Sequence, residues 1–430
     1  MQKRDFLKKL LIASGMASFP ALNHPLLAQS SFNGKLVMAL QLQGGVDVTA
    51  FCDPKENQSG EPEINWWARN DVTRSAGNID YAPFADNQAF FENHFQNMLV
   101  INGVDAQTNS HSVGVVNNWS GRNSEGYPSL TALYAAINAP DLPMSYLNFG
   151  GYGNTASLIR STRVDDVSQI QNIIFPNEDR YDSAASFRTD SDWQRIQNYQ
   201  AQSIDLLNQE SGLPAANRNN REFYLQALER AEGIKVFGNM IPDEDSIQEV
   251  RELEQNHYSS LHQQIQVSLL AFSSGVAICS GLYQDGFDSN ESNDADQSVL
   301  LSTTTDAIDY LWSTAEELGL ADRIVLVIGS DFGRTPHYNS GEGKDHWPIG
   351  SYIVMERNAS YTNQAFGETD GGHNAFSINT ESGQRDDVNG VTIKPAHVHL
   401  ALRNYLGINN SSQASQFPFN NTEDFNFFGS

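Results

Sequence analysis

Short runs of apolar residues recur along the chain and are separated by longer stretches in which polar and apolar positions mix. Continuous apolar runs of this kind are typical of strands that are buried on both faces. Helical spacing lies between several of the runs, over Asp296–Leu318 and over a segment from about His111 to Ile137. Strands that alternate with helices predict an α/β fold, in which a mostly parallel central sheet carries helices on both faces. The predicted strands are Leu36–Leu42, Met98–Val104, Ser145–Phe149, Val276–Tyr283, Arg323–Gly329 and Ser351–Met355.

The middle of the chain has a different pattern, mainly polar and helical. We interpret residues from about 164 to 273 as a helical insertion in one domain that spans residues 30–430, and a separate helical domain is the alternative. The expected apolar stripe of this insertion consists of Val250, Leu253, Leu261, Ile265 and Leu269.

The N-terminus has the order of a signal peptide. A basic head, Lys3–Lys9, precedes a short and weakly apolar run, and Ala28 offers a small residue for cleavage. Lys3–Lys8 resembles the twin-arginine box with Lys in place of its first Arg, and the general secretory route is the alternative. We therefore predict a twin-arginine-type signal at residues 1–28 and a periplasmic or secreted protein. No other apolar run is long enough for a membrane span, which needs about 20 residues.

Charge narrows the function classes further. The formal net charge is −26, and the basic signal segment leaves the rest of the chain more acidic still. Such a surface argues against binding to the nucleic-acid backbone. The two cysteines, Cys52 and Cys279, could pair in an oxidising compartment or remain as buried thiols.

Acidic and imidazole side chains follow several of the predicted strands. Asp47, His111, Asp288 and Asp331 come after four of them, and His346 lies a little further on. Ligands in open α/β sheets gather at the carboxyl ends of the strands, so we expect these groups at one edge. Each alone also fits a turn or a helix cap. Together, carboxylates and imidazoles suit a divalent cation.

The motifs in which these residues lie resemble a known family. They are Leu42–Asp47, Ser110-His111, Gly286-Phe287-Asp288, Ser330-Asp331-Phe332-Gly333-Arg334-Thr335 and Asp345-His346. In this order they are similar to an uncharacterised exported family with a twin-arginine signal, within the alkaline phosphatase and sulfatase superfamily. The resemblance implies a metal-dependent hydrolase of phosphate or sulfate esters built on a central sheet.

The resemblance also implies roles for single residues. Asp47, Asp288, Asp331 and His346 match metal ligands, for an ion that is Zn, Mn, Ca or Mg. The nucleophile position falls on His111, with hydroxyl groups on either side, so Ser110, His111 or Ser112 would supply the nucleophile or a further ligand. Arg334 would hold an anionic group of the substrate, with a structural salt bridge as the alternative. The substrate would be a small-molecule or glycan ester, and a protein partner is left open.

Two departures from the superfamily pattern support a second hypothesis. Asn290 stands where related chains commonly have a histidine, and Phe332 stands where superfamily enzymes often have a further histidine. With these imidazoles missing, the alternative is a non-catalytic exported binding or envelope-assembly protein on the same scaffold.

Overall fold

The computed structural model describes residues 32–164 and 247–429 and, between them, a part of the chain that includes 187–209 and 231–238. The predicted signal at 1–28 lies outside the described residues, so cleavage and export remain predictions.

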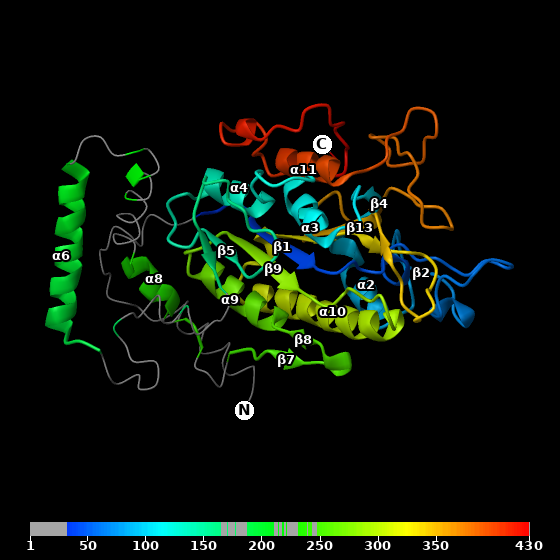
Figure 1. Ribbon diagram of the computed structural model, residues 1–430, viewed down its shortest axis with the longest axis horizontal. Coiled ribbons are helices and arrows are strands. Elements are labelled where there is room, and N and C mark those ends of the chain that lie inside the picture. Colours follow the sequence, from blue (N-terminus) through cyan, green and yellow to red (C-terminus); the bar gives the residue numbers. More distant parts are fainter. Residues whose placement is uncertain are drawn as a thin grey trace.

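An eight-stranded sheet forms the centre of the molecule, in the order β14-β4-β13-β10-β1-β9-β5-β6 (Figure 1). Strand β1 pairs in parallel with both of its neighbours, β10 and β9. Within this sheet, β13 is the one strand that is antiparallel to its neighbours. The predicted α/β class with a mostly parallel sheet is therefore confirmed. The strands are β1 (Leu36–Leu42), β4 (Met98–Asp105), β5 (Tyr146–Asn148), β6 (Ser161–Arg163), β9 (Cys279–Gln284), β10 (Ile324–Ser330), β13 (Ile349–Glu356) and β14 (Gln364–Phe366).

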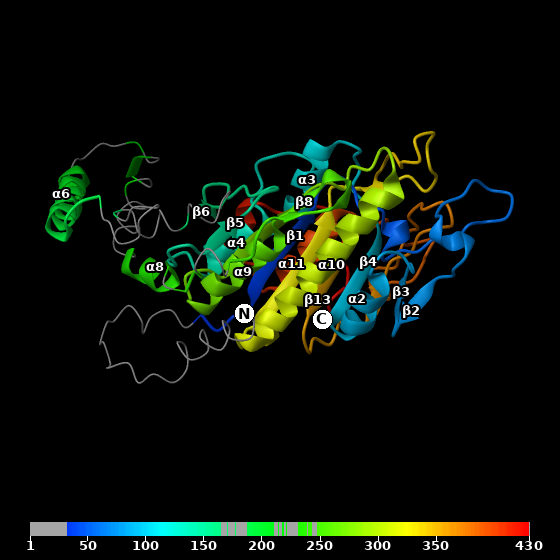
Figure 2. The same ribbon diagram turned by 90° about the horizontal axis from the view of Figure 1, so that it is seen from below.

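Helices cover both faces of the sheet, as predicted (Figures 1 and 2). One face carries α3 (His111–Ser120), α4 (Leu130–Asn138) and α11 (Pro395–Tyr405). The other carries α2 (Asn87–His94), α9 (Leu261–Ser273) and α10 (Asn293–Glu317). The last of these confirms the helix expected over Asp296–Leu318.

The prediction of one helix from His111 to Ile137 is wrong, because α3 and α4 are separate. Gly121 ends α3 in the left-handed conformation, with φ 70°. A side chain rarely adopts that backbone, so the glycine favours a stop there. The second helix begins after Ser129, whose hydroxyl accepts a hydrogen bond from the Ala132 N–H.

The middle segment is helical only in part. It contains α6 (Asp190–Gln209) and α8 (Ala231–Gly238), and α6 lies to one side of the layered body (Figures 1 and 2). The expected apolar stripe holds for α9, but Val250 and Leu253 flank β7 (Arg251–Glu252), which pairs with β8 (Tyr258–Ser259) in a small hairpin. The boundaries of the insertion remain a prediction.

Two further expectations concern the membrane and the cysteines. Over the part of the chain that the structure describes, no helix is long and apolar enough to cross a membrane. Cys52 and Cys279 are both buried free thiols. Of the two alternatives left open by the sequence, the structure therefore shows the unpaired one.

Candidate metal centre

The loops after the central strands meet at one edge of the sheet. Leu42, the last residue of β1, is in register with Ser330 at the end of β10 and with Gln284 at the end of β9. Gly44 allows the loop after β1 to contact the loop after β9. Its φ is 119°, and a Cβ there would lie 2.2 Å from the backbone nitrogen of Asp288.

Three side chains converge at this edge: His111, Asp288 and His346. One ligand atom from each lies within 4.8 Å of the others. The His111 Nε2 atom is 3.4 Å from Asp288 Oδ2, and the His346 Nε2 atom is 3.2 Å from Asp288 Oδ1. They come from the first residue of α3, from the loop after β9, and from β12 (His346–Trp347), which pairs with β11 (Gly333–Arg334).

The opposite nitrogen of each imidazole is held by an oxygen. His111 Nδ1 lies 2.6 Å from Asp331 Oδ2, and His346 Nδ1 lies 2.9 Å from the carbonyl oxygen of Asn109. A carbonyl only accepts, so the Nδ1 of His346 carries its proton, and the carboxylate favours the same tautomer in His111. In the neutral form of each ring, Nε2 then carries the lone pair and faces Asp288, with His346 Nε2 at hydrogen-bond distance from Oδ1. Hydrogen bonds of this kind orient metal-binding histidines in proteins.

Asp331 thus lies behind His111 instead of beside Asp288. It is buried, and its second carboxylate oxygen accepts a hydrogen bond of 3.0 Å from the Gly44 N–H. The hydrogen bond from His111 to Asp331 raises the pKa of the imidazole above its ordinary value. Asp331 therefore fixes the ring of His111 and is not one of the three converging groups.

Phe332 packs against both imidazoles. Its ring centroid is 4.8 Å from that of His111 and 4.6 Å from that of His346. The side chain is buried. The phenyl ring thus packs against both histidines.

Arg334 is fully buried and has no donor left for a substrate. Its guanidinium donates 2.7 Å to Asp288 Oδ1. Partial burial raises the pKa of Asp288, but the hydrogen bond and charge of Arg334, together with the hydrogen bond of His346 and the charge of His111, hold the pKa below its ordinary value. The anion-binding role expected from the sequence is not supported, and the structural alternative fits. The remaining acceptors of Arg334 are the carbonyl oxygens of Gly44, Gly45 and Lys344 and the Oδ1 of Asn290.

Asp47 lies apart from the converging groups, although the resemblance matched it to a metal ligand. Its carboxylate is fully buried and forms an ion pair of 2.7 Å with Lys344 Nζ. Burial raises the pKa of Asp47, but the charge and hydrogen bond of Lys344 lower it more, and the net shift is downward. Sequence reasoning missed Lys344, because a single lysine in a polar loop gives no signal of burial.

The two serine candidates lie at the exposed start of α3. Ser110 occupies the N-cap position without capping the helix through its side chain, and its Oγ is 3.2 Å from that of Ser112. Between them, the His111 ring points to Asp288 and Asp331, as expected for a further ligand.

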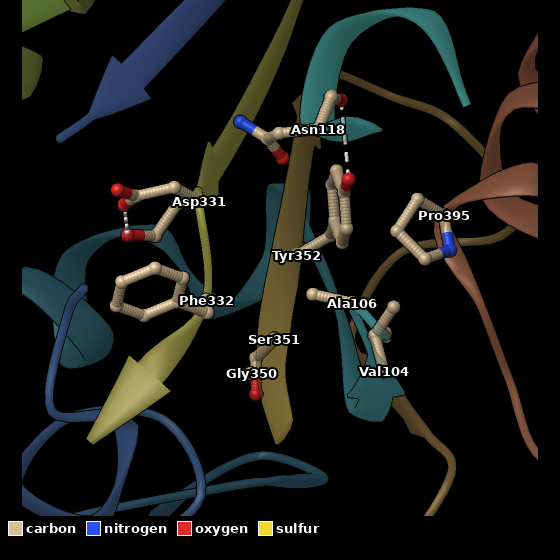
Figure 3. A pocket seen from close by; sticks show the side chains of 10 residues that line it. Val104, Ala106, Asn118, Asp331, Phe332, Gly350, Ser351, Tyr352 and Pro395 are labelled. Atoms are coloured by element: carbon tan, nitrogen blue, oxygen red, sulfur yellow. Dashed lines mark hydrogen bonds between the residues drawn. The ribbon is translucent and has the colours of Figure 1, made fainter. Parts of the chain in front are cut away.

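The three converging groups are partly exposed to solvent. The Asp288 side chain is 46% exposed, and the two imidazoles are about one-third and one-quarter exposed. On the protein side, behind Asp331 and Phe332, lies a cavity of about 10 Å³ that Asn118 and Tyr352 also line (Figure 3). That volume fits one water molecule.

Comparison with protein families gives one match. Residues 181–388 match the model of a family described as a protein of unknown function, DUF1501. This range contains Asp288, Arg334 and His346 but not His111. No curated protein matches the chain.

Several solved structures show a weak similarity to this chain at very low identity. The structure of Ps i-CgsB in complex with k-i-k-neocarrahexaose is 7% identical, with 92% of this chain and 76% of that chain covered and a TM-score of 0.41. The lipoteichoic acid synthase LtaP from Listeria monocytogenes is 10% identical, with 95% and 79% covered and a TM-score of 0.35. The phosphonate monoester hydrolase of Agrobacterium radiobacter is 10% identical, with 87% and 74% covered and a TM-score of 0.33. At this level of likeness the fold class rests on the chain's own topology.

Proposed function

We propose that this chain is an exported, divalent-metal-dependent hydrolase of phosphate or sulfate esters, with His111, Asp288 and His346 as the metal ligands. The observation that carries the proposal is the convergence of these three side chains, with both imidazoles oriented through Nδ1. The motif resemblance to the alkaline phosphatase and sulfatase superfamily supports the reaction class.

The donor set fits a divalent cation. In the neutral rings, with the proton on Nδ1, each Nε2 is an acceptor that faces an ionised carboxylate, which is also an acceptor. Two acceptors at this range repel each other unless a proton or a cation lies between them. The Nε2 of His111 is buried and has no hydrogen-bond partner. Imidazole and carboxylate ligands suit Zn²⁺ or Mn²⁺, and three protein ligands leave a tetrahedral ion one position for substrate or water.

A bound ion of this kind would polarise a phosphoryl or sulfuryl oxygen. The surrounding residues would keep the ligands ready for it. Asp331 and the Asn109 carbonyl hold the two rings, and Arg334 holds the carboxylate of Asp288 in its ionised form. The attacking oxygen would come from Ser110, from Ser112 or from water.

Metal analysis and ester hydrolysis test this proposal together. We expect the purified mature chain to hold one equivalent of a divalent metal and to hydrolyse p-nitrophenyl phosphate, its diester or p-nitrophenyl sulfate only with metal. His111→Gln, Asp288→Asn and His346→Gln should each lose metal and activity. Asp285→Asn and His337→Gln, nearby variants outside the converging group, serve as matched controls. A folded protein that holds no metal and gains no stability from added Zn²⁺, Mn²⁺, Ca²⁺ or Mg²⁺ would contradict the metal proposal.

The second candidate function is a non-catalytic binding or envelope-assembly protein on the same scaffold. Arg334 favours it, because a guanidinium with every donor used inside the protein does not bind an anionic ester. One equivalent of tightly held metal without turnover of any of the three esters would support this candidate. Loss of turnover in Ser110→Ala or Ser112→Ala alone, with metal retained, would support the hydrolase and identify its nucleophile.

Export is a separate part of the proposal and rests on residues 1–28. N-terminal sequencing of the protein recovered from the periplasm or the medium should begin close to Gln29. Recovery of the full-length chain from the cytoplasm alone would contradict export.

A further inference from the structure

A buried ion pair between Lys344 and Asp47 includes a residue of the loop that carries His346, and the proposed reaction does not use it. Both Lys344 and Asp47 are fully buried, with 2.7 Å between Nζ and Oδ2. The ammonium also donates to Asn65 Oδ1 at 3.0 Å and to Thr49 Oγ1 at 3.2 Å. An ammonium has three donors, so the three oxygens account for all of them.

The surroundings of this ammonium match those of a hard metal ion. A carboxylate, an amide carbonyl and a hydroxyl are all oxygen donors, the type of ligand that Ca²⁺ and Mg²⁺ take in proteins. The carboxylate is also fully used. Its Oδ2 accepts from Lys344 and from the Asn293 amide, and its Oδ1 accepts from the N–H and the hydroxyl of Thr49.

The backbone of Lys344 connects this cation to the converging groups. Its N–H donates 3.1 Å to the carbonyl oxygen of Ser289, the neighbour of Asp288. Its carbonyl oxygen accepts 2.9 Å from Arg334. His346 follows two residues later. The buried ammonium thus anchors the loop that delivers one imidazole and touches the loop that delivers the carboxylate.

We propose that the Lys344 ammonium is the resident cation of an oxygen-lined site around Asp47, so that the metal centre at His111, Asp288 and His346 holds a single ion. Lys344 is then a positioning residue, and Asp47 binds no metal. The single-ion count rests on the proposed function, whereas the cation site at Asp47 stands on its own contacts.

Counting bound Mn²⁺ tests the inference, since Mn²⁺ accepts oxygen ligands and is counted by equilibrium dialysis. Wild type should hold one equivalent per chain. Lys344→Ala removes the ammonium and leaves the three oxygens, so it should hold one equivalent more than wild type. The double variant D47N/K344A loses the carboxylate and should return to the wild-type count.

The outcomes separate the two proposals. Counts of zero, one and zero for wild type, Lys344→Ala and the double variant would contradict the proposed metal centre and keep the cation site. A folded Lys344→Ala that binds no more Mn²⁺ than wild type would overturn the inference. If Lys344→Ala does not fold, the double variant D47N/K344M, which removes both charges, is tested in its place. A bound Mn²⁺ count equal to that of wild type supports the inference. A wild-type count of two that falls to one in this variant would overturn it.

Discussion

At the residue scale, one nitrogen of the His111 imidazole is held by Asp331 and the other faces Asp288. Its Nδ1 is fixed by Asp331 at 2.6 Å, and its Nε2 faces Asp288 at 3.4 Å without a hydrogen bond. The geometry of the proposed metal centre thus depends on such supporting groups as much as on the ligands. Removing a support should therefore weaken metal binding without removing a ligand.

Asp331→Asn tests this assignment. An amide at this position has no net charge and presents either an acceptor or a donor to Nδ1, so the tautomer of His111 is less well fixed. Substitution of such supporting groups typically weakens metal affinity about 10- to 100-fold. Competition titration of Zn²⁺ against a chelator measures the change, with Asp345→Asn, an exposed neighbour, as the control. Equal Zn²⁺ affinities for Asp331→Asn and wild type would contradict the role of Asp331.

At this scale, the sequence predicted which charged side chains lie near the site better than it predicted which residues each of them contacts. The motifs pointed to His111, Asp288 and His346, which the structure brings together. They also pointed to Asp47 and Arg334, which instead meet a lysine and a set of internal carbonyl groups. A motif fixes which charges exist, but the partner of each charge depends on loops that are distant in the sequence.

His399 predicts a pH dependence of stability that is independent of any metal. The side chain is buried in α11 and lies 2.8 Å from the carbonyl oxygen of Asn118, and burial lowers its pKa to about 4. The unfolded chain takes up the proton from about pH 6.5 downward, whereas the folded chain does not until about pH 4. The stabilisation by neutral His399 is therefore complete above pH 6.5. It is lost as the pH falls toward 4, by about 3 kcal/mol at most.

Urea unfolding at pH 7 and at pH 4.5 measures this effect in wild type and in His399→Gln. The variant should lose less free energy of unfolding between the two pH values than wild type does, because glutamine does not titrate. Identical losses in both proteins would show that His399 does not contribute to acid destabilisation.

At the scale of elements, the contact between α3 and the end of β10 positions His111. Gly114 lies one turn after His111, and a Cβ there would be 2.4 Å from the carbonyl oxygen of Asp331. The glycine allows the helix to approach closely enough for His111 to reach the Asp331 carboxylate. The distance between helix and strand is thus part of the site.

Gly114→Ala should therefore weaken Zn²⁺ binding, although alanine favours a helix over glycine by about 1 kcal/mol. The added methyl group pushes α3 away from Asp331 and disturbs the contact with His111. Zn²⁺ titration together with thermal unfolding measures both effects, and Val113→Ala on the same helix is the control. Wild-type Zn²⁺ affinity in Gly114→Ala would contradict the close approach.

The sequence predicted the buried strands, including the three-residue β5, and missed the polar ones. All seven residues of β1 are buried, and its bounds agree with the apolar run. The three residues of β6 are polar and largely exposed, so no apolar run marked them. The antiparallel direction of β13 could not be predicted from the pattern either, because a run of apolar residues does not show which way a strand runs.

At the scale of the whole molecule, strand direction explains why residues far apart in the sequence meet. β4 runs in the same direction as β10, β1 and β9, although β13 separates it from them. The loops after these strands, including the start of α3, therefore lie at the same edge. The expectation of a shared edge was correct because it depends on strand direction alone, whereas the ligand set depends on side-chain contacts.

The central claim is that His111, Asp288 and His346 bind one divalent ion. Anomalous diffraction at the zinc edge, from crystals of the mature chain grown with Zn²⁺, tests it most directly. We expect one peak per chain at about 2.0–2.2 Å from both Nε2 atoms and from the Asp288 carboxylate, with none at Asp47. A peak coordinated by Asp47, or fully occupied zinc elsewhere and none between the two imidazoles, would contradict the account.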